Sequence, residues 1–232
     1  MQERRKKILK AVVKEYQRTG EPVASLDLAR RWHFNFSPAT ARAEMLVLDR
    51  EGFLDQPHTS AGRVPTDKAW RFFLEEFGEE ELNESERERV LAQMRRFHDD
   101  SMKEMAQFLA DCSRGLGVSG IFGDLADWHG AGLKWLAEEP EFEDGDLKNM
   151  MKCFDSLEGD FNKFFGDIDE ETEIFIGQEN PIKYLRNYSL VITGFEDEGE
   201  RGILGILGPK RMNYQKNKFV LEETRKKIKS KR

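Results

Sequence analysis

Residues 37–63 read SPATARAEMLVLDREGFLDQPHTSAGR, and this stretch decides the fold of the N-terminal part. Ser37 followed by Pro38 predicts a helix start, because serine caps a helix and proline suits its first position. The helical period places Ala41, Met45 and Leu48 on one face and leaves the opposite face to Ala39, Arg42, Ala43 and Arg50. After Gly52, the sequence predicts a short strand, a polar turn containing Gly62, and a return strand that ends at Pro65.

The flanking sequence predicts three more helices. Apolar residues from Ile8 to Tyr16 recur at helical spacing, and Gly20 and Pro22 end that helix. Ser25 is expected to cap a short second helix, SLDLARRW. Thr66 and Asp67 open another, with Trp70, Phe73, Leu74 and Phe77 on its buried side. Helix, helix, helix, hairpin is the winged helix-turn-helix order, and we assign it to residues 1–78 as a DNA-binding domain.

The remainder predicts a second domain over residues 84–232. Its first element is expected to be one long helix from about Glu84 to Leu116, long enough to suggest a partner helix across a dimer. Strands are expected at 118–123, 173–177, 189–195 and 202–208, with one or two helices within 128–160 and a helix at the C-terminal end. The predicted fold class is therefore α+β, with an antiparallel sheet and a long helix in the second domain.

Charge is distributed unevenly along the chain. The net charge is −7, yet residues 1–78 carry 14 Lys/Arg against 11 Asp/Glu, whereas residues 79–172 carry 10 against 25. DNA attracts the first segment and repels the second. No apolar run is long enough to span a bilayer, the N-terminus lacks the features of a signal peptide, and two cysteines without CxxC spacing fit a reducing cytoplasm.

Small residues with a few long polar ones are what a DNA-reading helix needs. Ser37, Ala39, Thr40, Arg42 and Ala43 supply that mix, and Arg42 suits a bidentate contact with guanine. The hairpin turn adds His58, Thr59, Ser60, Gly62 and Arg63, which suit contacts to the DNA backbone or minor groove. Lys68 and Arg71 complete the candidate set. No metal site, no cofactor and no nucleophile with its base are visible, so the sequence predicts neither a cofactor protein nor an enzyme.

The stretch SPATARAEMLVLDREGFLDQPHTSAGRVPTDKAWRFF resembles the N-terminal domain of the heat-inducible transcription repressor HrcA family. ILKAVVKEYQRTGEPVAS, IFIGQENPI, SLVITGF and LGILGPKRMNY match that family too. The resemblance implies a homodimeric repressor of chaperone genes on double-stranded DNA with an inverted-repeat operator. It also implies a GAF-like second domain that carries the dimer contacts, and an activity that depends on the GroEL/GroES chaperonin.

Two departures from the family pattern bear on function. Ala41 stands where the family has isoleucine and Ala43 where it has asparagine, and the second change removes a candidate base contact. The chain is also shorter than usual members between the expected long helix and IFIG, so its GAF-like domain is reduced. An alternative is that this is a protein-interaction or ligand-sensing module whose winged helix no longer reads a specific DNA sequence.

Overall fold

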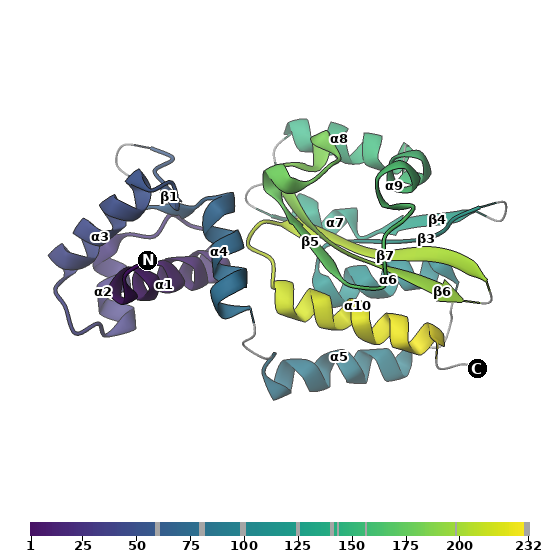
Figure 1. The fold of residues 1–232 in the computed structure, drawn as a ribbon, viewed down its shortest axis with the longest axis horizontal. Coiled ribbons are helices and arrows are strands. Elements are labelled where there is room, and N and C mark those ends of the chain that lie inside the picture. Colours follow the sequence, from purple (N-terminus) through teal and green to yellow (C-terminus); the bar gives the residue numbers. More distant parts are fainter. Residues whose placement is uncertain are drawn as a thin grey trace. The chain divides into compact units, whose positions relative to one another are not determined.

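We describe the protein from a computed structural model that covers residues 1–58, 61–78, 82–97, 101–123, 126–139, 142, 144–155, 157–197 and 199–229. The chain divides into two compact units, Met1–Glu80 and Glu81–Arg232, and each is described by itself. The regular elements of the described residues are helices and antiparallel strands, which confirms the α+β class (Figure 1).

The first unit consists of helices with one small hairpin. Its elements are α1 (Glu3–Thr19), α2 (Ser25–Trp32), α3 (Pro38–Arg50), β1 (Leu54–Asp55), β2 (Val64–Pro65) and α4 (Asp67–Phe77). Gly20 ends α1 in the left-handed region with φ 71°. The Ser37 side chain caps α3 with Pro38 at its first position, and the Thr66 side chain caps α4. The expected cap at Ser25 is wrong, because Ala24 takes the cap position of α2 and offers no side-chain oxygen.

The core of this unit is built from one face of each helix. Its fully buried side chains include Ile8, Leu9, Val12 and Val13 of α1, Leu28 of α2, Ala41 and Leu48 of α3, and Trp70 of α4. Tyr16 of α1 meets Trp70 with ring centroids 6.4 Å apart. Apolar burial of this kind dominates the stability of a small unit.

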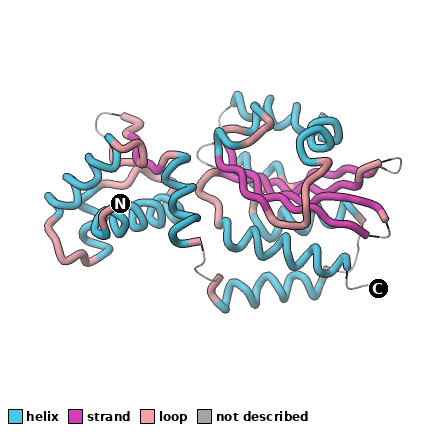
Figure 2. The backbone as a smooth tube through the Cα atoms, in the orientation of Figure 1, coloured by secondary structure: helices cyan, strands magenta, loops and turns pink. Residues whose placement is uncertain are grey.

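The second unit is a five-stranded antiparallel sheet between two layers of helices. Its strands are β3 (Leu116–Ile121), β4 (Asp127–Ala131), β5 (Glu173–Ile176), β6 (Tyr188–Asp197) and β7 (Glu200–Pro209), in the order β4-β3-β7-β6-β5. The helices are α5 (Glu84–Arg96), α6 (Met102–Ser113), α7 (Leu133–Ala137), α8 (Asp144–Asp155), α9 (Leu157–Phe165) and α10 (Tyr214–Lys229), with 3-10 turns at Gly177–Glu179 and Lys183–Leu185. Figure 2 shows the strands in magenta between cyan helices.

Successive side chains of a strand point to opposite faces of the sheet, and their contacts show which helices cover each face. Leu116 and Val118 of β3 join a core that includes Leu136 of α7 and Phe161 of α9. Residues between them point the other way, and an added Cβ at Gly117 would lie 2.2 Å from the Ala106 carbonyl oxygen of α6. On β6, the Ser189 hydroxyl lies 2.8 Å from the Tyr214 hydroxyl of α10. Helices α6 and α10 therefore cover one face of the sheet, and α7 and α9 cover the other.

The prediction of one long helix from Glu84 to Leu116 is wrong. Helix α5 ends at Arg96, Phe97 is extended with φ −84° and ψ 113°, and the Ser101 side chain caps the new helix α6. The Phe97 and Phe108 rings stack with centroids 4.8 Å apart, and the Cys112 thiol donates to Gln93 Oε1 over 3.0 Å. Helices α5 and α6 both pack against α10 within one chain, so the length of this segment no longer indicates a partner helix across a dimer.

Burial makes the Cys112 thiol unreactive. Desolvation raises its pKa to about 12 from the ordinary 9.0; the Asp111 charge adds to the rise and the Lys216 charge opposes it. Because the thiolate is the nucleophile, a raised pKa slows alkylation. We expect iodoacetamide to label Cys112 in the folded chain about a hundredfold or more slowly than in the urea-unfolded chain, because burial lowers both the thiolate fraction and access of the reagent. Peptide mass spectrometry of a labelling time course measures both rates; equal rates would contradict the buried position.

The predicted strands near residues 118, 173, 189 and 202 are present, and β6 pairs with β7 as its antiparallel neighbour. One strand was missed: β4 falls inside the segment where only helices were expected. It is an edge strand, paired with β3 alone.

Candidate nucleic-acid interface

The outer face of α3 is the central feature of the first unit. We use this name for its exposed residues, which recur every three or four positions: Ala39, Arg42, Ala43, Leu46 and Arg50. The opposite side of the helix is buried through Ala41, Met45 and Leu48. The exposed and buried sides of α3 are those expected from the sequence, and Leu46 is an exposed residue that was not predicted.

The start of α3 is fixed by its own hydroxyl groups. The Thr40 N–H donates to Ser37 Oγ over 3.2 Å, and the Ser37 and Thr40 hydroxyls lie 3.0 Å apart. This capping sets the direction in which α3 leaves the preceding turn. Ser37 is exposed and Thr40 half-buried, so their role in DNA contact stays a prediction.

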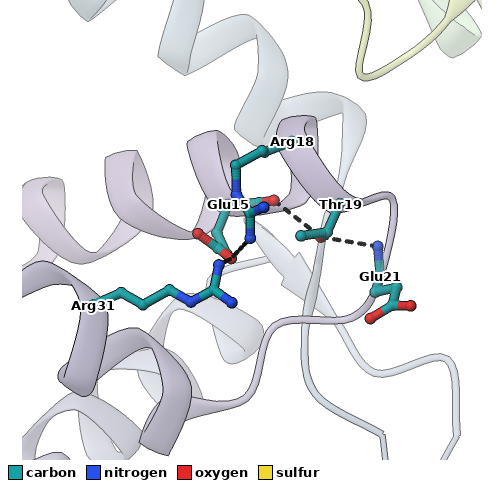
Figure 3. Close-up of polar contacts among 5 residues, drawn as sticks. All are labelled: Glu15, Arg18, Thr19, Glu21 and Arg31. Carbon is teal, nitrogen blue, oxygen red and sulfur yellow. Dashed lines mark hydrogen bonds and ion pairs between the residues drawn. The ribbon is translucent and has the colours of Figure 1, made fainter.

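Many cations of the first unit are neutralised by carboxylates. Figure 3 shows Glu15 of α1 paired with both Arg18 and Arg31: Glu15 Oε1 lies 2.6 Å from Arg18 Nη2 and 2.5 Å from Arg31 Nη1. The Arg31 pair ties α2 to α1. In the same picture Thr19 Oγ1 donates to the Glu15 carbonyl oxygen and accepts from the Glu21 N–H, which shapes the end of α1.

Further pairs join α1 to later elements. Arg5 contacts Glu44 at 3.1 Å and Glu51 at 2.7 Å, and Lys6 contacts Glu76 at 2.6 Å. By contrast, within the described part of the chain neither Arg42 nor Arg50 has an ion-pair or hydrogen-bond partner for its guanidinium. The outer face of α3 therefore presents two uncompensated positive charges.

The hairpin holds Arg63 away from solvent. Arg63 Nε lies 2.7 Å from Asp49 Oδ2 of α3, and only 13% of the Arg63 side chain is exposed. Arg63 Nε has no well-aligned hydrogen-bond partner among the described residues, so this contact is an ion pair alone. The Arg63 backbone also exchanges hydrogen bonds with Val23, which adds the loop before α2 to the hairpin. The arginine thus links three segments, and its expected role as a free cation at the turn is less well supported than a structural one.

The rest of the candidate set is divided. His58 is exposed, whereas Thr59 and Ser60 lie outside the described residues. Lys68 Nζ donates to the Glu51 carbonyl oxygen over 2.8 Å and lies 4.3 Å from the centre of the Phe53 ring. Arg71 is half-buried and makes contacts of its own. Lys68 and Arg71 therefore contribute to packing at the start of α4, and any contact with DNA is additional.

Gly62 is required by a close backbone approach. A Cβ at Gly62 would lie 2.4 Å from the Val23 carbonyl carbon and 2.5 Å from its oxygen, and backbone atoms cannot yield as a side chain does. We expect Gly62→Ala to lower the free energy of unfolding by about 1–2 kcal/mol by overpacking. Urea unfolding followed by circular dichroism measures this. Gly145→Ala is the control, because a Cβ there meets nothing within 4 Å, and an equal loss in both variants would contradict the argument.

A cavity of about 520 Å³ lies between α3, the start of α2 and the hairpin. Its lining combines apolar and polar groups: Val23, Ala24, Ser25, Arg42, Met45, Leu46, Gln56, Ala61, Gly62 and Arg63. The structure thus brings Arg42, Gly62 and Arg63 together around one cavity. From the sequence, Arg42 was expected on a helix and the other two in the hairpin turn. Gln56 closes the hairpin by donating from Nε2 to the Ala61 carbonyl oxygen over 3.0 Å.

The described part of the chain offers neither a metal site nor a membrane-spanning helix. No group of three or more His, Cys, Asp or Glu side chains there could hold a metal ion. No helix among the described residues is both long and apolar enough to cross a membrane.

The chain is similar to a family of known proteins over most of its length. The family model of the HrcA protein C-terminal domain matches residues 67–217. The heat-inducible transcription repressor HrcA of Natranaerobius thermophilus is 42% identical over 107 residues, which are 46% of this chain and 31% of the relative. The repressor of the same name from Thermodesulfovibrio yellowstonii is 26% identical and aligns over 93% of each chain. The first relatives are thus matched over about a third of their own length.

One solved structure supports the fold. A crystal structure of a hypothetical protein covers 99% of this chain and 98% of its own, with a TM-score of 0.80 at 19% identity. The sequence relatives are transcription repressors by name. Because the family model covers more than half of the sequence, this chain belongs to the HrcA family, as its resemblance indicated.

Proposed function

We propose that the chain is a sequence-specific DNA-binding transcriptional repressor whose first 78 residues act as a winged helix-turn-helix. The observation that carries the proposal is the outer face of α3, where Arg42 and Arg50 are uncompensated in a unit that neutralises many other cations. Ala39 and Ala43 lie beside them, and side chains this small let a helix approach the floor of the major groove. The names of the relatives support the same reading.

In this proposal α3 enters the major groove and the β1–β2 hairpin meets the adjacent backbone. Arg42 is exposed, can reach base edges, and suits the bidentate pattern of guanine. The hairpin is braced against α3 by the Arg63–Asp49 pair and against the α1–α2 loop by the Val23 bridge. The bracing keeps helix and hairpin in a fixed geometry, which simultaneous contact with a groove and the adjacent backbone requires.

The proposal is tested by selection from a pool of random DNA duplexes with the full chain. We expect an enriched sequence made of two related half-sites about one helical turn or more apart, with a dyad between them. Duplexes that bind without any common sequence would indicate the interaction or ligand-sensing alternative. Cooperative loss of binding on scrambling one half-site is the internal control.

We further propose that residues 84–232 form a reduced GAF-like domain that dimerises in the cytoplasm, as the family resemblance implies. A five-stranded antiparallel sheet with helices on both faces is compatible with that assignment. Light scattering of the complex with the selected duplex should give two chains per duplex. One chain per two half-sites would contradict the dimer.

Regulation of chaperone genes through GroEL/GroES belongs to the same proposal and rests on the resemblance. We expect chaperonin to raise the fraction of refolded chains that bind the selected duplex. An unfolded competitor protein should reverse that gain. If the fraction of DNA-binding chains did not change, the proposed dependence on chaperonin would be wrong, whereas the proposed DNA binding would be unaffected.

A further inference from the structure

Leu46 places an apolar side chain in the middle of the outer face of α3. It is 41% exposed, and it is the one large hydrophobic side chain of α3 that is markedly exposed. Solitary exposed leucines are common on protein surfaces, so exposure alone is not a reason to assign a role. Its neighbours on the helix provide that reason.

Arg42, Leu46 and Arg50 follow one another at four-residue spacing, so the leucine lies between two arginines on one side of the helix. Both guanidinium groups lack a partner in the described part of the chain, whereas Met45 next to Leu46 is buried. A partner for this surface must therefore carry negative charge on both sides of a small apolar group. The major groove of DNA has that character, with phosphates along its edges and a methyl group on each thymine.

We infer that Leu46 contacts the C5 methyl group of a thymine and is a specificity-determining residue. The inference rests on the proposed function and deepens it by naming a base that α3 reads. Four residues of helix rise by about 6 Å, whereas base pairs of duplex DNA are about 3.4 Å apart. The thymine should therefore lie within about two base pairs of the one whose recognition depends on Arg42.

Replacement of thymine by deoxyuridine removes only the methyl group and tests this directly. In the duplex selected by the full chain, each thymine is replaced singly and the dissociation constant is measured at one salt concentration. We expect one thymine per half-site whose replacement weakens binding about fourfold, the value of one methyl-sized group leaving water. Leu46→Ala should bind the thymine duplex about as weakly as the unchanged chain binds the deoxyuridine duplex, and should no longer distinguish the two.

Two variants separate a base contact from other effects. Leu46→Met keeps an apolar side chain and should retain the discrimination. Leu26→Ala removes a leucine of α2 that is 49% exposed and lies outside α3, and it should leave the discrimination unchanged. Circular dichroism confirms that each variant is folded.

The results of these experiments separate a failure of the Leu46 contact from a failure of the proposed sequence-specific DNA binding. If selection returns no common sequence, the proposed function fails and the inference fails with it. If a sequence is selected but Leu46→Ala keeps the full deoxyuridine effect, or no thymine is sensitive, only the inference is overturned. A changed oligomeric state of Leu46→Ala with unchanged discrimination would assign the leucine to a protein contact instead.

Discussion

Replacing Arg42 with alanine is expected to weaken binding to the selected duplex by about 1–3 kcal/mol and to relax the preference at one base position in each half-site. Arg42 is exposed on the outer face of α3 and has no partner among the described residues, so its guanidinium is available for a base edge. Titration against duplexes that carry each of the four bases at every position, at constant salt, measures both effects.

Arg30→Ala is the matched control for Arg42→Ala. Arg30 is an exposed arginine of α2 that likewise lacks a partner in the part of the chain described, and its removal changes the net charge by the same amount. The control should retain the full base preference. If Arg42→Ala weakened all sequences alike, Arg42 would be a phosphate contact, and the proposed direct reading by this residue would be wrong.

Replacing Trp70 with alanine is expected to destabilise the chain by about 3–5 kcal/mol. Trp70 is 1% exposed, extends from α4 into the core and meets Tyr16 of α1. Its loss leaves a cavity between α4 and α1, and α1 packs against α3. Such a loss is a large fraction of the free energy of unfolding of a typical domain, which is roughly 5–15 kcal/mol. Urea unfolding followed by far-ultraviolet circular dichroism gives the free energy.

Trp32→Ala serves as the comparison for Trp70→Ala. Trp32 is half-buried at the end of α2, where it stacks on Phe34 at 6.5 Å between ring centroids. A smaller loss is expected there, because less of the ring is removed from water. Equal losses from the two tryptophans would argue against a core centred on Trp70.

Local signals in the sequence were sufficient for much of the fold. Ser37–Pro38 and Thr66 begin helices because capping depends on a few adjacent residues, and both caps are present. The buried and exposed sides of α3 follow from the helical period alone. The β6 and β7 strands are also predicted, because residues 189–195 and 202–208 are short and largely apolar runs.

The wrong predictions, the unbroken long helix and the missed strand β4, have the same cause: both features depend on contacts between residues distant in the sequence. The break after Arg96 was missed because apolar spacing continues through Phe97 and Met102, whereas the Phe97–Phe108 stack and the Cys112–Gln93 hydrogen bond join residues distant in the sequence. Strand β4 has the sequence DWHGA, which is poor in β-branched residues; it forms by pairing with β3. No local pattern encodes such a pairing.

In the candidate site, too, local sequence predicted which way a side chain faces but not its distant partners. The period of α3 predicted that Arg42 faces outward, but nothing in the sequence around Arg63 indicates its pair with Asp49. Leu46 was overlooked because an apolar residue in an amphipathic helix is ordinarily assigned to the core. Its exposure could have been found by noting that it lies four residues from both Arg42 and Arg50.

We propose that α3 and its hairpin together recognise a DNA sequence. The most direct measurement is the ratio of the dissociation constants for the selected duplex and for a scrambled duplex of the same composition, at physiological salt. Sequence-specific repressors of this kind bind their site about a thousandfold or more tightly than other DNA, and we predict a ratio of that order. Equal affinity for the two duplexes would contradict the account.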